Sequence, residues 1–212
     1  MNLLCCPRAV RGRAALLAAT LSVLLGCSAN GGRVAVPAFS PDAAAARALA
    51  DYDTNKDGFL DSRELERCPA LKDSLKTLDR DRDGRLSTQE IADRLAAYQR
   101  SAIGRVNCSC QVRWEHGPLV GALVTFVPEA FLGPSFKPAS GVSDEHGRVV
   151  LKMDGEEQPG LACGFYRITV SKKDASGRET IPARYNERTI LGREVGPAMR
   201  RGLTLHLTQA GS

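Results

Sequence analysis

Two short segments of this chain place oxygen-bearing side chains at alternate positions, then a glycine, and at the end a glutamate. They run from Asp53 to Glu64 and from Asp79 to Glu90. A hard divalent cation such as calcium takes six to eight oxygen ligands at roughly 2.3–2.6 Å, and a short loop must curl around the ion to supply them. Gly58 and Gly84 stand where such a loop makes its sharp turn, with a positive φ that a Cβ would obstruct. The spacing therefore predicts a calcium site in each segment, whereas magnesium, which requires strict octahedral geometry, fits less well.

Both segments resemble the calcium-binding loop of the EF-hand family and match its pattern at every ligand position. The resemblance implies two calcium ions, each held by side-chain oxygens, one backbone carbonyl and a terminal glutamate that binds through both oxygens. The first loop would supply Asp53, Asn55, Asp57, the carbonyl of Phe59, Asp61 and Glu64. The second loop would supply Asp79, Asp81, Asp83, the carbonyl of Arg85, Ser87 and Glu90. Leu60 and Leu86 occupy the apolar position of each loop, and the resemblance implies that they join in a short two-stranded bridge.

Basic residues inside the loops offset part of the negative field that attracts the ion. These residues are Lys56, Arg63, Arg80, Arg82 and Arg85. Extracellular EF-hand modules bind calcium at roughly 10⁻⁴ to 10⁻³ M. We therefore interpret the two sites as mainly structural ones, which are saturated outside the cell.

Helical signals flank both loops, as a loop that curls around an ion requires. Ser40-Pro41 predicts an N-cap followed by a proline in the first turn of an alanine-rich helix. Residues Ser87 to Glu90 form a capping-box pattern, and apolar residues follow at helical spacing. Pro69 divides the connection between the loops into a short exit helix and a short entry helix. We expect a small helical EF-hand pair over residues 41–100.

From about Gly104 the apolar pattern changes from a helical period to the alternation that is typical of strands. We expect strands over residues 105–114, 119–127, 140–143, 148–153, 164–171 and 203–207, with 140–153 forming a hairpin. Short strands at a spacing of about ten residues predict a small β-sandwich. The expected fold class is therefore α+β with two domains: the EF-hand pair, then an Ig-like or prealbumin-like antiparallel β-sandwich over residues 104–208.

The C-terminal half also resembles the carboxypeptidase regulatory-like, or transthyretin-like, β-sandwich domains. The segments that carry this resemblance are 117–129, 141–147 and 164–171, and residues 181–186 resemble a closing segment of short lipoproteins from planctomycete-type bacteria. These motifs encode turns and core contacts rather than chemistry. The resemblance implies an accessory or binding module, without a catalytic role.

The N-terminus has the composition of a secretory signal. Arg8, Arg11 and Arg13 precede an apolar run from Ala14 to Leu25, which is too short to span the roughly 30 Å core of a bilayer. The sequence Leu24-Leu25-Gly26-Cys27 is similar to the lipobox of bacterial lipoproteins. The resemblance implies that residues 1–26 are removed, that Cys27 carries a lipid, and that residues 27–40 form a tether. An ordinary secretory signal that happens to end before a cysteine is the alternative.

Four cysteines would remain in the mature chain, namely Cys68, Cys108, Cys110 and Cys163. In an oxidising compartment they allow three disulfide pairings. Alternation along a strand puts Cys108 and Cys110 on one face, where a bond between them has poor geometry. We expect one of these two to pair with Cys163 and the other with Cys68. A metal site at the Cys-x-Cys pair is the weaker alternative.

Composition and the scattered histidines argue against two other functions. Aromatic residues make up 5% of the chain and no basic stripe is present, which argues against nucleic acid as a partner. Three of the arginines behind the net charge of +5 belong to the predicted signal. No nucleophile, base and orienting group can be assembled around His116, His146 or His206, so we expect no enzyme.

The sequence thus predicts a calcium-ion-binding, lipid-anchored protein of the cell envelope, on its periplasmic or extracellular side. Its expected role is structural or that of a binding module, with the membrane and an unknown envelope protein or glycan as partners. A calcium-dependent adhesion or carbohydrate-binding protein is one alternative and would need an exposed aromatic patch. An accessory-domain protein of an envelope hydrolase is the other and would need a convergent polar pocket.

Overall fold

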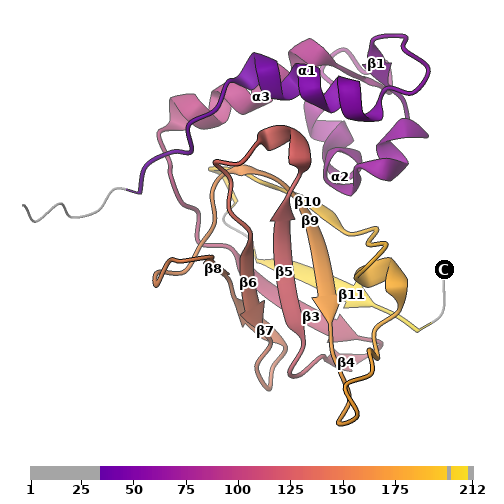
Figure 1. The fold of residues 1–212 in the computed structure, drawn as a ribbon, viewed down its shortest axis with the longest axis vertical. Helices are drawn as coiled ribbons and strands as arrows, with labels where there is room; N and C mark the ends of the chain where they lie inside the picture. Colours follow the sequence, from indigo (N-terminus) through magenta and orange to yellow (C-terminus); the bar gives the residue numbers. More distant parts are fainter. Residues whose placement is uncertain (1–33, 200–201, 210–212) are drawn as a thin grey trace, which may run out of the picture. The chain divides into compact units, whose positions relative to one another are not determined.

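Three helices build the N-terminal part of the computed structural model, which describes residues 34–199 and 202–209 (Figure 1). Helix α1 spans Pro41–Tyr52, α2 spans Pro69–Leu78 and α3 spans Thr88–Ser101, and the short 3-10 helix η1 covers Glu64–Arg67. The Ser40 side chain accepts a hydrogen bond of 3.3 Å from the amide of Ala43, which confirms the predicted N-cap. The predicted capping box of α3 is also present, since Ser87 and Glu90 exchange both hydrogen bonds.

A two-stranded bridge joins the loops that lie between these helices. Strand β1 (Phe59–Leu60) pairs in antiparallel fashion with β2 (Leu86–Ser87), so that Leu60 lies opposite Leu86. Both leucine side chains are fully buried. The bridge expected from the loop pattern is therefore confirmed, and it holds the two loops side by side.

Two larger sheets follow in the chain. The five-stranded sheet has the order β10-β9-β5-β6-β8 and comprises β5 (Leu123–Pro128), β6 (Ala139–Val142), β8 (Lys152–Met153), β9 (Gly164–Ser171) and β10 (Gly192–Val195). The four-stranded sheet comprises β3 (Ser109–Trp114), β4 (Gly117–Pro118), β7 (Arg148–Val150) and β11 (Leu203–Leu207). Two further 3-10 helices are η2 (Ala130–Leu132) and η3 (Ala183–Tyr185). The chain is therefore an α+β protein, and its predicted strands 164–171 and 203–207 are found with the same bounds.

One expectation about strand pairing is wrong, and a second holds only in part. The four-stranded sheet is mixed rather than antiparallel, because β11 pairs with β3 in parallel. The hairpin expected over residues 140–153 is formed at its open end, where β6 pairs with β8 in antiparallel fashion and Ser140 lies opposite Lys152, whereas β7 between them pairs with β3 in the other sheet. The backbones come close where the chain changes sheets, since a Cβ on Gly141 would lie 2.3 Å from the carbonyl oxygen of Val150. Strand β10, in which two charged residues follow Gly192, was not predicted.

One hydrophobic core connects the helices with both sheets. Helix α2 lies so close to β10 that a Cβ on Gly192 would stand 2.1 Å from the carbonyl carbon of Pro69. The ring of Tyr98 on α3 lies 6.0 Å from the ring of Phe165 on β9. The described residues accordingly belong to one compact unit.

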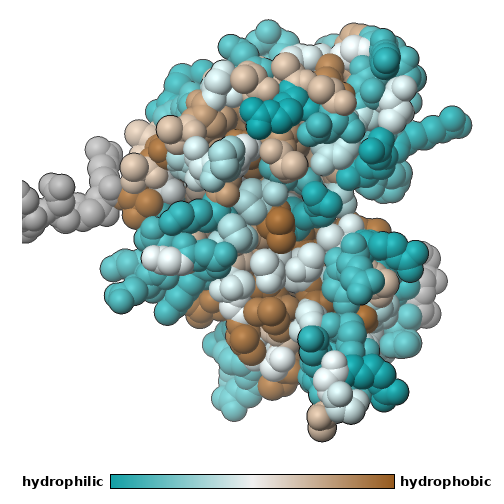
Figure 2. Space-filling model, viewed as in Figure 1, coloured by the Kyte–Doolittle hydropathy of each residue, from teal (hydrophilic) through white to brown (hydrophobic). Residues whose placement is uncertain are grey.

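The surface of this unit is uneven in polarity. Figure 2 shows hydrophilic residues over much of the helical part and apolar surface over β5 and β6. Leu123 and Val142, which are cross-strand partners, expose 45% and 62% of their surfaces there. No helix in the described part of the chain is long and apolar enough to cross a bilayer. The predicted signal, Cys27 and the first half of the tether, up to residue 33, lie outside the described residues.

Candidate metal centre

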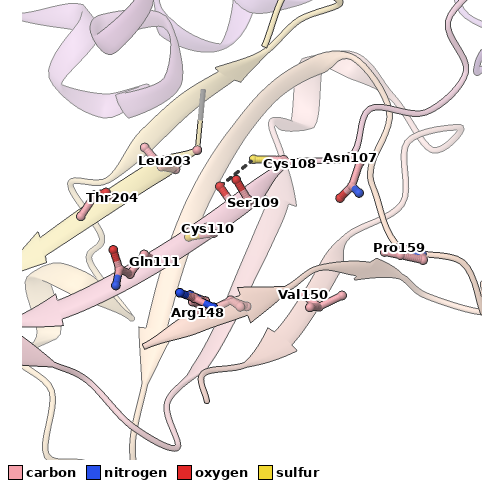
Figure 3. Close-up of a pocket in the computed structure, with 12 residues that line it drawn as sticks. Asn107, Cys108, Ser109, Cys110, Gln111, Arg148, Val150, Pro159, Leu203 and Thr204 are labelled. Atoms are coloured by element: carbon pink, nitrogen blue, oxygen red, sulfur yellow. Dashed lines mark hydrogen bonds between the residues drawn. The ribbon is translucent and has the colours of Figure 1, made fainter. Parts of the chain in front are cut away.

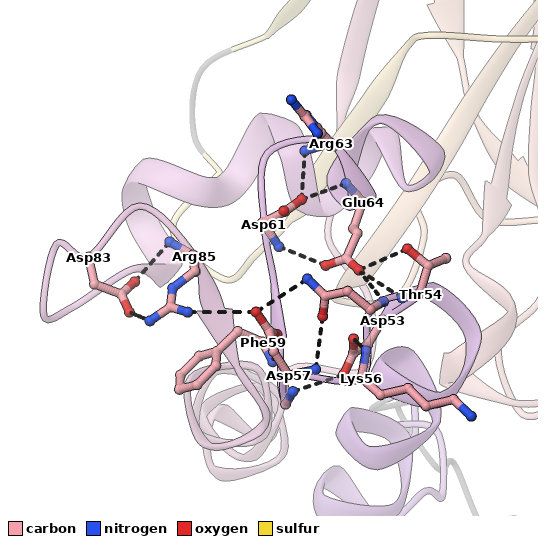
Figure 4. Close-up of polar contacts among 12 residues, drawn as sticks. Asp53, Thr54, Lys56, Asp57, Phe59, Asp61, Arg63, Glu64, Asp83 and Arg85 are labelled. Carbon is pink, nitrogen blue, oxygen red and sulfur yellow. Dashed lines mark hydrogen bonds and ion pairs between the residues drawn. The ribbon is translucent and has the colours of Figure 1, made fainter.

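The first loop is shaped by its own carboxylates, which accept hydrogen bonds from backbone amides further along the loop (Figure 4). Asp53 accepts from the amides of Lys56 at 2.6 Å and Gly58 at 3.0 Å. The Oδ1 atom of Asn55 accepts from the amide of Asp57 at 2.8 Å, and Asp57 Oδ1 accepts from the amide of Phe59 at 3.0 Å. Each acceptor bonds an amide two to five residues further along, so the side chains of Asp53, Asn55 and Asp57 fold back over their own loop.

The second loop repeats these hydrogen bonds position by position. Asp79 accepts from the amides of Arg82 at 2.6 Å and Gly84 at 3.0 Å. Asp81 Oδ1 accepts from the amide of Asp83 at 3.2 Å, and Asp83 Oδ1 accepts from the amide of Arg85 at 2.8 Å. The agreement follows from the shared spacing of the side chains, since the residues between the ligands differ.

The turn of each loop depends on two positive backbone angles. Gly58 and Gly84 have φ of 85° and 81°, and the residues two places before them, Lys56 and Arg82, have φ of 61° and 63°. A left-handed conformation is unfavourable for residues with a Cβ, and here the amide bonds to Asp53 and Asp79 compensate for the strain. The predicted glycine role is therefore confirmed at both positions.

The terminal glutamate of each loop folds back to the start of its loop. Glu64 Oε1 accepts from the amide of Thr54 at 2.7 Å, and its Oε2 accepts from the amide of Asp61 at 3.0 Å. Glu90 Oε1 accepts in the same way from the amide of Arg80 at 2.8 Å, and Oε2 from the amide of Ser87 at 2.9 Å. Each carboxylate thus connects the first residues of its loop with the last ones.

Glu64 is held more deeply than its counterpart. Its residue surface is only 4% exposed, and it also accepts from the amide of Asn55 and the hydroxyl of Thr54. The amide of Asp61 lowers the pKa of the Glu64 carboxyl; burial opposes this effect, and the amides of Thr54 and Asn55 add to the lowering. Glu64 is therefore ionised at neutral pH, as a calcium ligand must be.

These residues fit a calcium ion. The carboxylates of Asp79, Asp81 and Asp83 each bring one oxygen to within 4.8 Å of the others. Among the acidic, histidine and cysteine side chains in the described part of the chain, this is the group that could hold a metal ion. The first loop has Asn55 at the middle of the three corresponding places, so it has two carboxylates there and shares with the second loop the pattern of amide hydrogen bonds. Hard oxygen donors in this arrangement suit calcium.

The ninth residue of each loop, Asp61 or Ser87, also stabilises the start of the helix that follows. The sequence pattern predicted this second role for Ser87 but not for Asp61. Asp61 Oδ1 accepts from the amides of Arg63 at 2.8 Å and Glu64 at 3.0 Å, and so stabilises the start of η1. Ser87 caps α3 through the amide of Glu90 at 3.3 Å. A ligand role for either side chain must therefore share its oxygens with a helix start.

A buried polar cluster, which sequence analysis missed, lies directly behind the first loop. Glu129, which follows β5, accepts from the hydroxyl of Tyr52 at 3.2 Å and faces Arg167 at 3.3 Å. Its side chain is fully buried, and Oε1 has no hydrogen-bond partner among the described residues. Burial raises the pKa of the Glu129 carboxyl, and Arg167 opposes this rise. Tyr52 immediately precedes the first ligand, Asp53, so the cluster connects the loop with the sheet.

A matching contact secures the helix that leaves the second loop. Glu194 on β10 accepts from the hydroxyl of Tyr98 at 2.5 Å and from Nε of Arg94 at 2.6 Å. This contact lies on the body of α3 rather than beside a ligand. In both halves of the EF-hand pair, a tyrosine of a helix is thus bound by a glutamate of the sheet, and neither glutamate could be recognised from spacing.

The four cysteines are free thiols in the structure, so the expected disulfides are not formed. Cys68 lies near Glu129, where burial and the neighbouring carboxylate raise the pKa of its thiol. Burial likewise raises the pKa of Cys110 to about 12 and that of Cys163 to about 11. Cys68 belongs to the junction behind the first loop, beside Tyr52 and Glu129.

A cleft of about 500 Å³ lies over β3, β7 and β11 (Figure 3). Cys108 and Cys110 are among the residues that line it, and Arg148 is the one charged residue among the described residues of this lining. The raised pKa values keep both thiols protonated, which makes them poor nucleophiles. His206 is exposed on β11. The described residues of the lining offer no acid–base pair.

Comparison with known families agrees with the geometry of the two loops. The family model described as EF hand matches residues 46–69 and again residues 71–95. No curated protein and no solved structure matches the chain. The two tandem matches include both loops with all twelve predicted ligands, and they indicate calcium binding. The chain thus contains an EF-hand pair.

Proposed function

We propose that this chain is a calcium-binding protein of the cell envelope in which each loop of the EF-hand pair takes one calcium ion. The observation that carries the proposal is the repetition of one hydrogen-bond frame in both loops, from Asp53 to Glu64 and from Asp79 to Glu90. A frame that directs the same oxygens inward twice supports two equivalent ions. The ligands are the twelve residues named from the sequence.

The calcium ions have a structural role in this proposal, rather than that of a signal that opens a groove. Helix α2 lies against β10, and Tyr98 of α3 donates a hydrogen bond to Glu194 of that strand. A sensor pair must separate its helices to expose an apolar groove. Here the helix faces are already buried against the sheet, so calcium would fix the loops without releasing a target-binding surface.

Calorimetric titration of the purified mature chain with calcium tests this function. We expect two ions per chain, with dissociation constants of roughly 10⁻⁴ to 10⁻³ M and little change in helix content. Glu64→Gln together with Glu90→Gln should abolish binding, because each change removes a carboxylate that would bind through two oxygens. Binding that persists in the double variant would show that other residues hold the ions.

The lipid anchor and the C-terminal half complete the proposal. The lipobox-like sequence ending at Cys27 supports a diacylglycerol attached to that cysteine, and several acyl chains on one residue make a stable anchor. The strand motifs between residues 117 and 171 support a carboxypeptidase regulatory-like β-sandwich that serves as a structural or binding module. Intact-mass measurement after expression in a lipoprotein-processing bacterium should show the lipid, and Cys27→Ala should release the protein from the membrane fraction.

A further inference from the structure

Arg85 is the residue of the second loop whose side chain reaches into both calcium loops (Figure 4). Its Nη2 atom lies 3.2 Å from Oδ2 of Asp83 in its own loop. Its Nη1 atom lies 3.8 Å from Oδ2 of Asp57 in the first loop. The guanidinium also lies over the ring of Phe59, at 4.1 Å from the ring centroid. The antiparallel pairing of β1 with β2 allows this contact, because it holds the loops side by side.

The two oxygens that face Arg85 are the ones that the backbone amides of the loops do not bind. Asp57 Oδ1 accepts from the amide of Phe59, and Asp83 Oδ1 accepts from the amide of Arg85. The Oδ2 atom of each carboxylate accepts no hydrogen bond from a described backbone amide and lies against the guanidinium, and Asn55 Nδ2 also donates to Asp57 Oδ2 at 3.3 Å. A calcium ion bound in either loop would therefore need an oxygen that Arg85 contacts, and it would also repel the guanidinium charge.

We propose that the Arg85 side chain sets the calcium affinity of both loops and couples them, by competing with calcium for Asp57 in the first loop and for Asp83 in the second. This inference rests on the proposed calcium binding. Because one guanidinium contacts both carboxylates, it has to move away only once when two ions bind. The free energy of moving it weakens the binding of the first ion but not that of the second, so binding becomes positively cooperative.

The test compares Arg85→Gln with Arg80→Gln in calorimetric titrations of the full mature chain with calcium chloride. Both variants remove one arginine from the second loop and keep the backbone carbonyl. Arg80 pairs with Asp93 at 2.8 Å, and Asp93 is not a predicted ligand. Arg80→Gln therefore measures the effect of charge alone. For Arg85→Gln we expect a further tightening of the first binding step by roughly two- to fivefold, the size of an exposed ion pair, with reduced cooperativity.

A second comparison isolates the contact between the loops. In a Glu90→Gln background only the first loop binds calcium, so any effect of Arg85 must pass through Asp57. We expect Arg85→Gln to tighten this single site by roughly twofold or more beyond the change in Arg80→Gln. Equal calcium affinities of the Arg85→Gln and Arg80→Gln variants would overturn the proposal. A change in affinity that is confined to the second loop would overturn it too. A wild-type chain that binds no calcium would instead overturn the proposed function itself.

Discussion

The first and second calcium loops share the same hydrogen bonds at matching positions, but they stand on different supports. Asp53 and Asp79 each accept two amide bonds of equal length in the two loops. Behind the first loop, Tyr52 reaches the buried Glu129 of the sheet part. The second loop continues into the long helix α3, and its terminal Glu90 is partly exposed where Glu64 is buried.

This difference shows that two levels of structure act on a calcium loop. Local spacing of side chains determines the frame, which is why the two loops agree. Tertiary contacts determine how firmly each frame is held, and there the loops differ. The first loop should therefore respond to changes in the sheet, whereas the second should respond mainly to changes within itself and in its helix.

The largest expected effect comes from breaking the contact between α2 and β10, which lies beside the exit of the first loop. In Gly192→Ala the new Cβ would lie 2.1 Å from the carbonyl carbon of Pro69 and 2.2 Å from the amide nitrogen of Ala70. Backbone atoms cannot move aside as a flexible side chain can, so one element must shift. We expect the free energy of unfolding to fall by about 3 kcal/mol, measured by urea denaturation.

Gly117→Ala serves as the matched control. No atom lies within 4 Å of the position of its Cβ, and Gly117 lies in β4, away from the helices. We expect its free energy of unfolding to stay within about 0.5 kcal/mol of the wild type. Trp114, the single tryptophan of the chain, reports the unfolding of the sheet part in both variants. Equal values for the two variants would mean that α2 is not held tightly against β10.

The next largest effect is a difference in stability between variants of the two terminal glutamates, measured in the absence of calcium. In the wild type, backbone amides donate to the buried Glu64 carboxylate. Glu64→Gln places an NH₂ group, which cannot accept, against some of these amides. We expect a loss of about 2 kcal/mol in the free energy of unfolding, since buried donors are left unpaired. Glu90 is partly exposed, so water can replace its bonds and Glu90→Gln should lose less than about 1 kcal/mol. Urea denaturation in a calcium chelator measures both, and equal losses would contradict the difference in support.

The sequence predicted the loops well because every determinant of a loop lies within a few residues. The amide bonds of Asp53, the turn at Gly58 and the cap at Ser87 are all local, and each was found where its motif placed it. Strands with clear alternation, such as residues 164–171, were predicted for the same reason.

Contacts between distant segments could not be predicted in this way. Glu129 and Tyr52 are 77 residues apart, and an isolated glutamate after a strand carries no signal of burial. The parallel pairing of β11 with β3 and the change of sheet between β6 and β7 depend on how strands assemble, which periodicity does not encode. The short strand β10 contains Arg193 and Glu194, whose polar character hid it from the strand pattern.

The pH dependence of stability tests the cluster behind the first loop. Burial raises the pKa of the Glu129 carboxyl, with Tyr52, Cys68 and Arg167 as its polar neighbours. The contribution of Glu129 is therefore fully present below the ordinary carboxyl pKa and is lost as the pH rises through the value in the folded protein. Glu129→Gln stays uncharged and keeps an oxygen for Tyr52. Between about pH 5 and about pH 8 it should lose about 1 kcal/mol less stability than the wild type for each unit by which the pKa is raised.

Urea denaturation at several pH values gives this difference directly. Glu194→Gln, which alters the contact on α3, is the natural comparison, since it changes the other tyrosine–glutamate pair. Parallel pH profiles of wild type and Glu129→Gln would show that the Glu129 carboxyl does not titrate with a raised pKa.

The smallest effect should be the same in both loops and concerns their turns. Gly58 and Gly84 have φ of 85° and 81°, and no atom lies within 4 Å of the position of a Cβ on either residue. Alanine at these positions would therefore meet no steric clash, and only the strain of the left-handed backbone remains, at about 1 kcal/mol for each. Thermal unfolding of Gly58→Ala and Gly84→Ala in a chelator measures this strain. Because strain at a turn is local, the two losses should agree even though the loops stand on different supports. A clearly larger loss at Gly58 would mean that the sheet also constrains the turn of the first loop, and the frame would then not be set by spacing alone.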